Sequence, residues 1–143
     1  MSQPDATRRH RFTIAGVTVT DEEDSKELRK RFLAKKLWVI MTRRCVPVEE
    51  MQRHLGAHLR HQISLEKKGI MYGAGPCHAP AAPEPAFGLI IIRAADESEA
   101  RRIADSDPMH VAGVRKYELF QWTMNEGQMR IALNFSDQTY QFE

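Results

Sequence analysis

Along residues 37–122 of this chain, short apolar runs typical of strands alternate with segments whose apolar residues recur with the period of a helix. Apolar segments of strand length occur at residues 37–41, 70–72, 87–92 and 114–122. A helical pattern from Pro47 to Lys68, stopped by Gly69, separates the first two, and residues 97–104 predict a second helix. The order strand, helix, strand, strand, helix, strand predicts an α+β, ferredoxin-like sandwich, with two helices on one face of a four-stranded sheet.

Two extensions flank this predicted domain. Residues 1–36 contain a polar tail to about residue 10, an edge strand at 11–20 with a break at Gly16, and a charged helix to about Lys36. Residues 123–143 contain the turn Asn125-Glu126-Gly127 and a hairpin formed by residues 129–135 and 139–142. We therefore divide the chain into an N-terminal extension, a ferredoxin-like domain at 37–122 and a C-terminal hairpin extension.

The predicted strands carry aromatic and branched residues on both faces. Helices cover only one face of such a sheet, so the other face needs a cover of its own. A second copy of the same sheet is the simplest cover, which predicts a homodimer or a higher homo-oligomer.

Composition narrows the function classes. The 143 residues suffice for one domain with a core, and the contents of 42% hydrophobic and 28% charged residues are ordinary. A net charge of +2, scattered basic residues and 8% aromatic content argue against nucleic acid as a partner. No apolar run reaches the roughly 20 residues that span a membrane, and the first residues lack a secretory signal, which favours the cytoplasm. In that compartment Cys45 and Cys77 are expected to be reduced thiols.

Three histidines lie on the first predicted helix. On a helical wheel, an apolar stripe is formed by Val48, Met51, Leu55, Leu59 and Ile63. His58 falls roughly 70° from the centre of that stripe, and His54 and His61 fall roughly 110° to 130° away. A border position suits a general base that is partly desolvated and still reachable, but it equally suits a histidine that only bonds a nearby acceptor. The spacing also resembles a zinc site, yet no acidic ligand or HExxH context accompanies it, so we predict no metal.

Other candidate residues lie in loops and strand ends. Asp107 precedes Pro108, which is typical of a helix N-cap, and a capping carboxylate can still accept a bond from a histidine. The segment Gly73-Ala74-Gly75-Pro76 predicts a tight turn whose glycines allow positive φ and close approach to a ligand, which makes Gly75 and Pro76 candidates. Arg43, beside Arg44 at the end of the first strand, is a candidate for an anionic substrate, with surface solvation as the alternative.

The segment from Leu37 to Trp122 resembles the YCII-related (YciI-like) proteins of the dimeric α/β-barrel superfamily. The similarity rests on the strand LWVIMTR, a histidine eleven residues before Gly69, the GAGP segment, the strand FGLIIIRA and the block ESEARRIADSDP. The resemblance implies a His–Asp dyad at His58 and Asp107. It also places His110, in a DPxH variant of the motif, in the same pocket.

Two functions of different classes follow. The first is a lyase or isomerase without a cofactor, in which His58 moves a proton on a small cyclic or enolisable compound and Asp107 orients the imidazole. The second is a non-catalytic dimeric module that binds a small ligand or a partner, which the predicted helix at residues 21–36 mildly favours.

Overall fold

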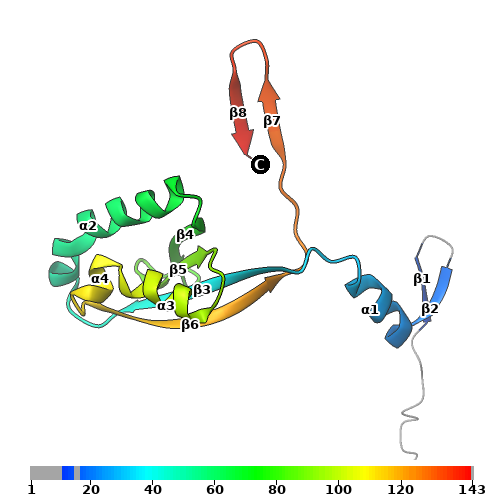
Figure 1. Ribbon diagram of the computed structural model, residues 1–143, viewed down its shortest axis with the longest axis horizontal. Helices are drawn as coiled ribbons and strands as arrows, with labels where there is room; N and C mark the ends of the chain where they lie inside the picture. Colours follow the sequence, from blue (N-terminus) through cyan, green and yellow to red (C-terminus); the bar gives the residue numbers. More distant parts are fainter. Residues whose placement is uncertain (1–10, 15–16, 143) are drawn as a thin grey trace, which may run out of the picture. The chain divides into compact units, whose positions relative to one another are not determined.

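The structure is a computed structural model that describes residues 11–14 and 17–142, with side chains from residue 24 to residue 141. It divides into one unit formed by residues 35–124 and another formed by the described parts of 1–34 and 125–143 (Figure 1). The predicted tail at residues 1–10 and the break at Gly16 lie outside the described residues.

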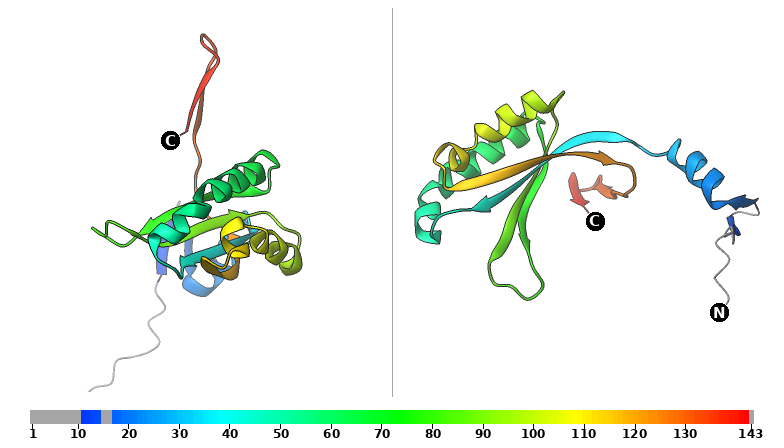
Figure 2. Two further views of the ribbon diagram at one scale, coloured as in Figure 1. Left: turned by 90° about the vertical axis from the view of Figure 1, so that its left-hand side faces the viewer. Right: turned by 90° about the horizontal axis from the view of Figure 1, so that it is seen from below.

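The unit of residues 35–124 is a ferredoxin-like sandwich, which confirms the predicted fold class. Its strands are β3 (Lys35–Arg44), β4 (Met71–His78), β5 (Pro85–Ile92) and β6 (Arg115–Met124). The sheet has the order β4-β5-β3-β6, and all its neighbours pair antiparallel. The helices α2 (Val48–Lys67), α3 (Glu97–Asp105) and α4 (Pro108–Val111) lie on one face of it (Figure 2).

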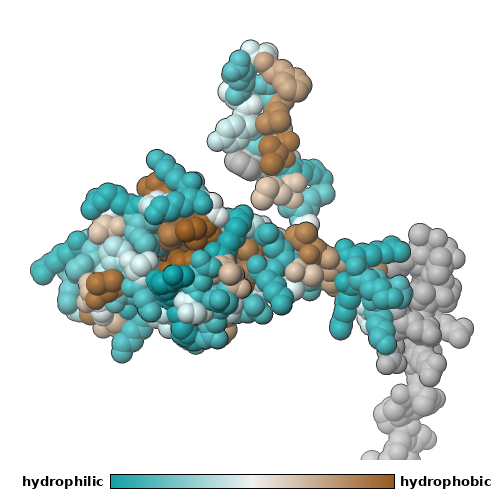
Figure 3. Space-filling model, in the orientation of Figure 1, coloured by the Kyte–Doolittle hydropathy of each residue, from teal (hydrophilic) through white to brown (hydrophobic). Residues whose placement is uncertain are grey.

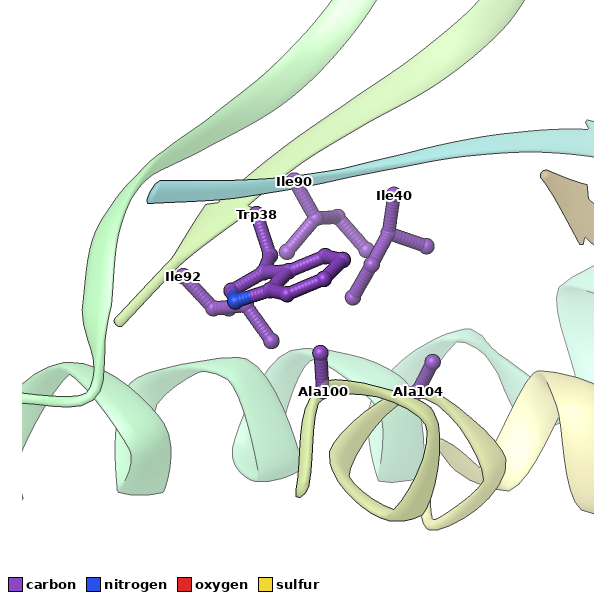
Figure 4. Packing of buried hydrophobic residues seen from close by; sticks show 6 residues of the cluster. All are labelled: Trp38, Ile40, Ile90, Ile92, Ala100 and Ala104. Carbon is purple, nitrogen blue, oxygen red and sulfur yellow. The ribbon is translucent and has the colours of Figure 1, made fainter. Parts of the chain in front are cut away.

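The core lies between this sheet and α3. Trp38 and Ile40 of β3 stand in register with Ile92 and Ile90 of β5, and all four are buried. Figure 4 shows their side chains directed toward α3, which presents Ala100 and Ala104 to them. These small residues let the helix approach the sheet closely, so the indole and the branched side chains fill the space between the layers.

The opposite face of the sheet is apolar as well. Because side chains alternate along a strand, Val39 points away from the helices, and its register partners are Phe120 of β6 and Ile91 of β5. Phe120 is 45% exposed and Trp122 is 37% exposed. A sheet face of this composition is what the sequence predicted.

The predicted turn at Gly73-Ala74-Gly75-Pro76 is wrong. These four residues lie inside β4, where Gly73 pairs with Ile91 and Pro76 pairs with Gly88. Neither Gly73 nor Gly75 has a positive φ. Since β4 is an edge strand, the missing N–H of a proline can face away from the ladder, and the segment extends instead of turning. The turn comes later, at residues 79–84, where Ala81 has a φ of 61°.

The flanking elements differ in part from the prediction. The strands β1 (Arg11–Ile14) and β2 (Val17–Thr20) pair with each other as a hairpin instead of forming one edge strand. The helix α1 (Asp21–Arg29) is shorter than predicted, because Lys35 and Lys36 already belong to β3 and pair with Met124 and Thr123.

The predicted C-terminal hairpin is confirmed. It consists of β7 (Ile131–Asn134) and β8 (Thr139–Phe142), which pair antiparallel. Ile131 and Leu133 are 55% and 65% exposed, and Figure 3 shows apolar side chains along β7.

No helix in the described part of the chain is long and apolar enough to cross a bilayer. The cytoplasmic location remains a prediction. Cys45 and Cys77 are both free thiols.

Candidate active site

A cavity of about 460 Å³ lies between α2 and the helix-facing side of the sheet. Its roof on α2 includes Met51, Leu55, Leu59 and Ile63, and its floor comes from β3, β4 and β5. Its size is in the range that holds a small organic ligand. In the view of Figure 3 the surface of this unit is mostly hydrophilic, with an apolar area next to α2.

Most of the apolar stripe on α2 lines this cavity instead of packing into the buried core. Leu55, Leu59 and Ile63 are 39%, 49% and 49% exposed, and the buried residues of the helix are Gln62 and Leu65. The stripe lines the cavity because α2 lies over an open space at the β4–β5 side of the sheet. The helix that packs closely against the sheet is α3.

His58 and Asp107 meet in this structure. Nδ1 of His58 lies 2.9 Å from Oδ1 and 2.8 Å from Oδ2 of Asp107, although 49 residues separate them in the chain. The side chain of Asp107 is 3% exposed and that of His58 is 17% exposed. His58 lines the cavity, and the carboxylate lies behind it. The carboxylate is thus sheltered while the imidazole remains within reach of a ligand.

Asp107 is held by its position at the start of α4. It is the N-cap of that helix, with Oδ1 accepting a bond of 2.9 Å from the backbone N–H of Met109. Gln62, one helical turn beyond His58, donates Nε2–H to Oδ2 over 2.9 Å. Burial alone would raise the pKa of the Asp107 carboxyl, but the hydrogen bonds from His58 and Met109 outweigh it and hold this pKa below its usual value. The cap and the histidine partner are therefore one and the same carboxylate.

The Asp107 carboxylate fixes the tautomer of His58. An ionised carboxylate only accepts hydrogen bonds, so Nδ1 of His58 carries a proton and donates it to Asp107. In the neutral imidazole Nε2 then has a free lone pair, which can accept a proton. This arrangement can perform general acid–base catalysis.

His110 lies beside this pair and makes two bonds of its own. Nδ1 donates to the backbone oxygen of Ala104 over 2.6 Å, so in the neutral ring Nε2 accepts from the Thr42 hydroxyl at 2.9 Å. The ring also packs against Tyr117, with centroids 4.8 Å apart. Thr42 lines the cavity and His110 does not. His110 thus positions a residue of the cavity wall, and its predicted contact with substrate remains a prediction.

The remaining predicted residues separate into two groups. Gly75 and Pro76 line the cavity that holds His58. Arg43 lies in the wall of a neighbouring cavity of about 380 Å³, where it forms an ion pair of 2.6 Å with Glu118 and stacks on Phe87. The structure does not bring Arg43 to His58.

Sequence reasoning missed four polar residues that line the cavity: Thr42, Gln62, Glu66 and Arg115. Thr42 had a signal, since it continues the helix-facing positions Trp38 and Ile40 of β3 as a polar residue. Gln62 had one too, because it lies four positions after His58 on the same helix face. Arg115 had no such signal in the sequence, because the register of β6 against β3 decides whether its side chain faces the cavity.

The other histidines of α2 do not join the site. His61 accepts or donates a bond of 3.3 Å with Ser106, and burial lowers its pKa. In the part of the chain that the structure describes, no group of three or more His, Cys, Asp or Glu side chains is placed to hold a metal ion.

Comparison with known proteins relates this chain to a solved structure and to a family model. A search of curated proteins finds no match. Among solved structures, the fold is similar to that of 5-chloro-2-hydroxyhydroquinone dehydrochlorinase (TftG) from Burkholderia phenoliruptrix AC1100, in complex with 2,5-dihydroxybenzoquinone. The TM-score is 0.50 at 17% sequence identity, and the match covers 60% of this chain and 93% of that one. The family model of the YCII-related domain matches residues 36–123, and on this basis the chain belongs to the YCII-related family.

Proposed function

We propose that this protein is a lyase or isomerase that works without a cofactor, with His58 as its general base and acid. The observation that carries the proposal is the bond of 2.8 Å between His58 Nδ1 and a buried carboxylate, in a histidine that lines a cavity. The substrate would be a small cyclic or enolisable compound that fits beside the apolar side chains of α2.

The chemistry follows from the two ring nitrogens. Nε2 of His58 takes a proton from a carbon or hydroxyl of the substrate, and the imidazolium that forms is stabilised by the negative charge of Asp107. The proton then returns to another atom of the substrate, or a leaving group departs as the new double bond forms. Asp107 holds the tautomer and the ring orientation through both steps.

Family membership supports this class of reaction. The structurally similar TftG is by its name a dehydrochlorinase, which is a lyase. At 17% identity the likeness concerns the fold, so the substrate is left to experiment.

The test is turnover of chlorinated hydroquinones and enolisable lactones by the unmodified protein and by His58→Ala. Removal of the base is expected to lower the rate by about 10² to 10⁴. Proton exchange from substrate into D₂O, followed by NMR, reports the same step without requiring product release. The matched control is His54→Ala, one turn earlier on α2 and not part of the cavity wall. Equal turnover by His58→Ala and the unmodified protein on the same substrate rejects the proposal.

A non-catalytic binding module is the alternative, favoured by the largely apolar roof of the cavity. In that case a ligand raises the melting temperature without being converted, and His58→Ala retains the effect.

We further propose that two copies of the chain pair through the uncovered sheet face that carries Val39, Phe120 and Trp122. Support comes from the apolar character of that face and from the exposure of its aromatic residues in a single chain.

A further inference from the structure

Arg115 is a charged residue of the cavity wall that takes no part in the proton transfer proposed for His58. It begins β6 and faces the helices, since its neighbours at alternate positions, Tyr117 and Leu119, pack against the core. It lines both the cavity of His58 and the neighbouring cavity of Arg43. Its guanidinium therefore lies where the two spaces meet.

The guanidinium is poorly partnered. In the described part of the chain its hydrogen bond runs from Nη1 to the backbone oxygen of Thr42, over 3.4 Å. Its Nε is buried and has no partner among the described residues. A guanidinium has five N–H donors, so most of its capacity remains unused. Burial lowers the pKa of Arg115 relative to an exposed arginine, a sign that the charge has lost part of its hydration.

The neighbouring arginines differ in this respect. Arg43 pairs with Glu118 at 2.6 Å, and Arg44 pairs with Glu84 at 3.3 Å. Among the residues that the structure describes, no carboxylate forms such a pair with Arg115. Of the three arginines at the second cavity, Arg115 is thus the one without an ion pair to a described residue, and the buried Asp107 carboxylate acts on its charge only from a distance.

The structure keeps space for this guanidinium. A Cβ on Gly88 would lie 3.1 Å from Nη1 of Arg115 and 2.9 Å from Cγ2 of Thr42. Glycine at this position lets the arginine lie across the strand beside Thr42, at the floor of the cavity.

We propose that Arg115 binds an anionic oxygen of the substrate, a carboxylate or an ionised ring hydroxyl, while the ring occupies the apolar cavity beneath α2. The inference rests on the proposed function, because it assigns the substrate class of the same site. It selects planar organic anions over neutral rings of the same shape, since a guanidinium pairs with two oxygens at once.

Binding of a matched pair of probes tests the proposal without turnover. The probes are 2,5-dihydroxybenzoate and its amide, which differ in charge and hardly in shape, measured by calorimetry at low salt. The unmodified protein is expected to bind the anion about tenfold or more tightly than the amide. Arg115→Gln is expected to abolish this preference, and Arg115→Lys to keep part of it because the charge remains.

The control is Arg102→Gln, which removes the same charge from an exposed site on α3 and should leave the preference intact. Circular dichroism confirms that each variant is folded. The absence of an anion preference in the unmodified protein, or a preference that survives in Arg115→Gln, overturns the proposal.

His58→Ala separates the two proposals. If the base proposal is wrong and the subsite exists, His58→Ala matches the unmodified protein, with equal turnover or with none in either, and the anion preference still depends on Arg115. If the subsite proposal is wrong and the base exists, His58→Ala loses turnover while no anion preference is found.

Discussion

Asp107 shows how one residue can serve the fold and the site together. Its carboxylate caps α4 through Met109, accepts from Gln62 and accepts from His58. A helix of four residues has little stability of its own, so the cap and the two side-chain bonds fix its start. The position of the His58 imidazole thus depends on a carboxylate that also caps α4.

Replacing Asp107 by alanine is expected to lower the free energy of unfolding by about 2–4 kcal/mol at neutral pH, from the lost cap and the buried donors left without an acceptor. Asp107→Asn should cost less, because its oxygen still caps α4. Since the folded pKa of Asp107 lies below the unfolded value, its ionic contribution is present above roughly pH 4 and is lost as the pH falls through the folded pKa. Urea unfolding at several pH values measures this, and the gap between Asp107→Asn and the unmodified protein should narrow below pH 4. A gap that stays constant into strong acid contradicts the argument.

The candidate site was predictable from single residues only in part. The helical angle of His58 placed it at the border of an apolar stripe, and the Asp-Pro step marked Asp107 as a cap, yet neither pattern alone paired them. The family resemblance supplied the pairing, and the structure has the two side chains within hydrogen-bond distance. Arg115 could not be found in this way, because strand register decides which charged side chain faces the cavity.

At the scale of elements, the GAGP segment and the apolar stripe on α2 depart from what the sequence suggests for one physical reason. The GAGP segment contains residues typical of a turn, and the stripe on α2 contains residues typical of a core, but tertiary pairing decides both. β5 holds the glycines extended by pairing with them, from Gly73–Ile91 to Pro76–Gly88. The same long β4–β5 pair forms part of the floor under α2, so the leucines of that helix line a cavity.

Among the glycines of this strand pair, Gly88 has the least space for a side chain. Gly88→Ala would place a methyl group 2.9 Å from the buried Thr42, which is stiff because it is β-branched and bonded to His110. The expected loss of stability is about 1–3 kcal/mol. Gly73→Ala, where nothing lies within 4 Å, should change it by less than about 0.5 kcal/mol. Thermal or urea unfolding of both variants checks this, and similar costs at the two glycines would show that the restricted space is not what matters.

At the scale of the molecule, the helices cover one face of the sheet and leave the aromatic residues of the other face exposed. Trp38 and Ile40 are covered by α3, whereas Val39 and its neighbours Ile91 and Phe120 face the other way. The sequence could predict that this face needs a cover, since both sets of alternate positions are apolar. The sequence could not predict what covers this face, because the strand pattern of one chain does not specify which surface packs against it.

Pairing of two copies through this face predicts a mass in solution of at least twice 16.4 kDa, measured by sedimentation equilibrium. Phe120→Glu places a charge on this face, where a second copy would desolvate it, and is expected to yield monomers. The chain itself should tolerate the change, because Phe120 is 45% exposed in a single copy. Val111→Glu is the matched control, at a residue of α4 on the helix side that is 73% exposed, and it should leave the mass unchanged. A monomeric unmodified protein, or an assembly that Phe120→Glu leaves intact, shows that this face has another cover.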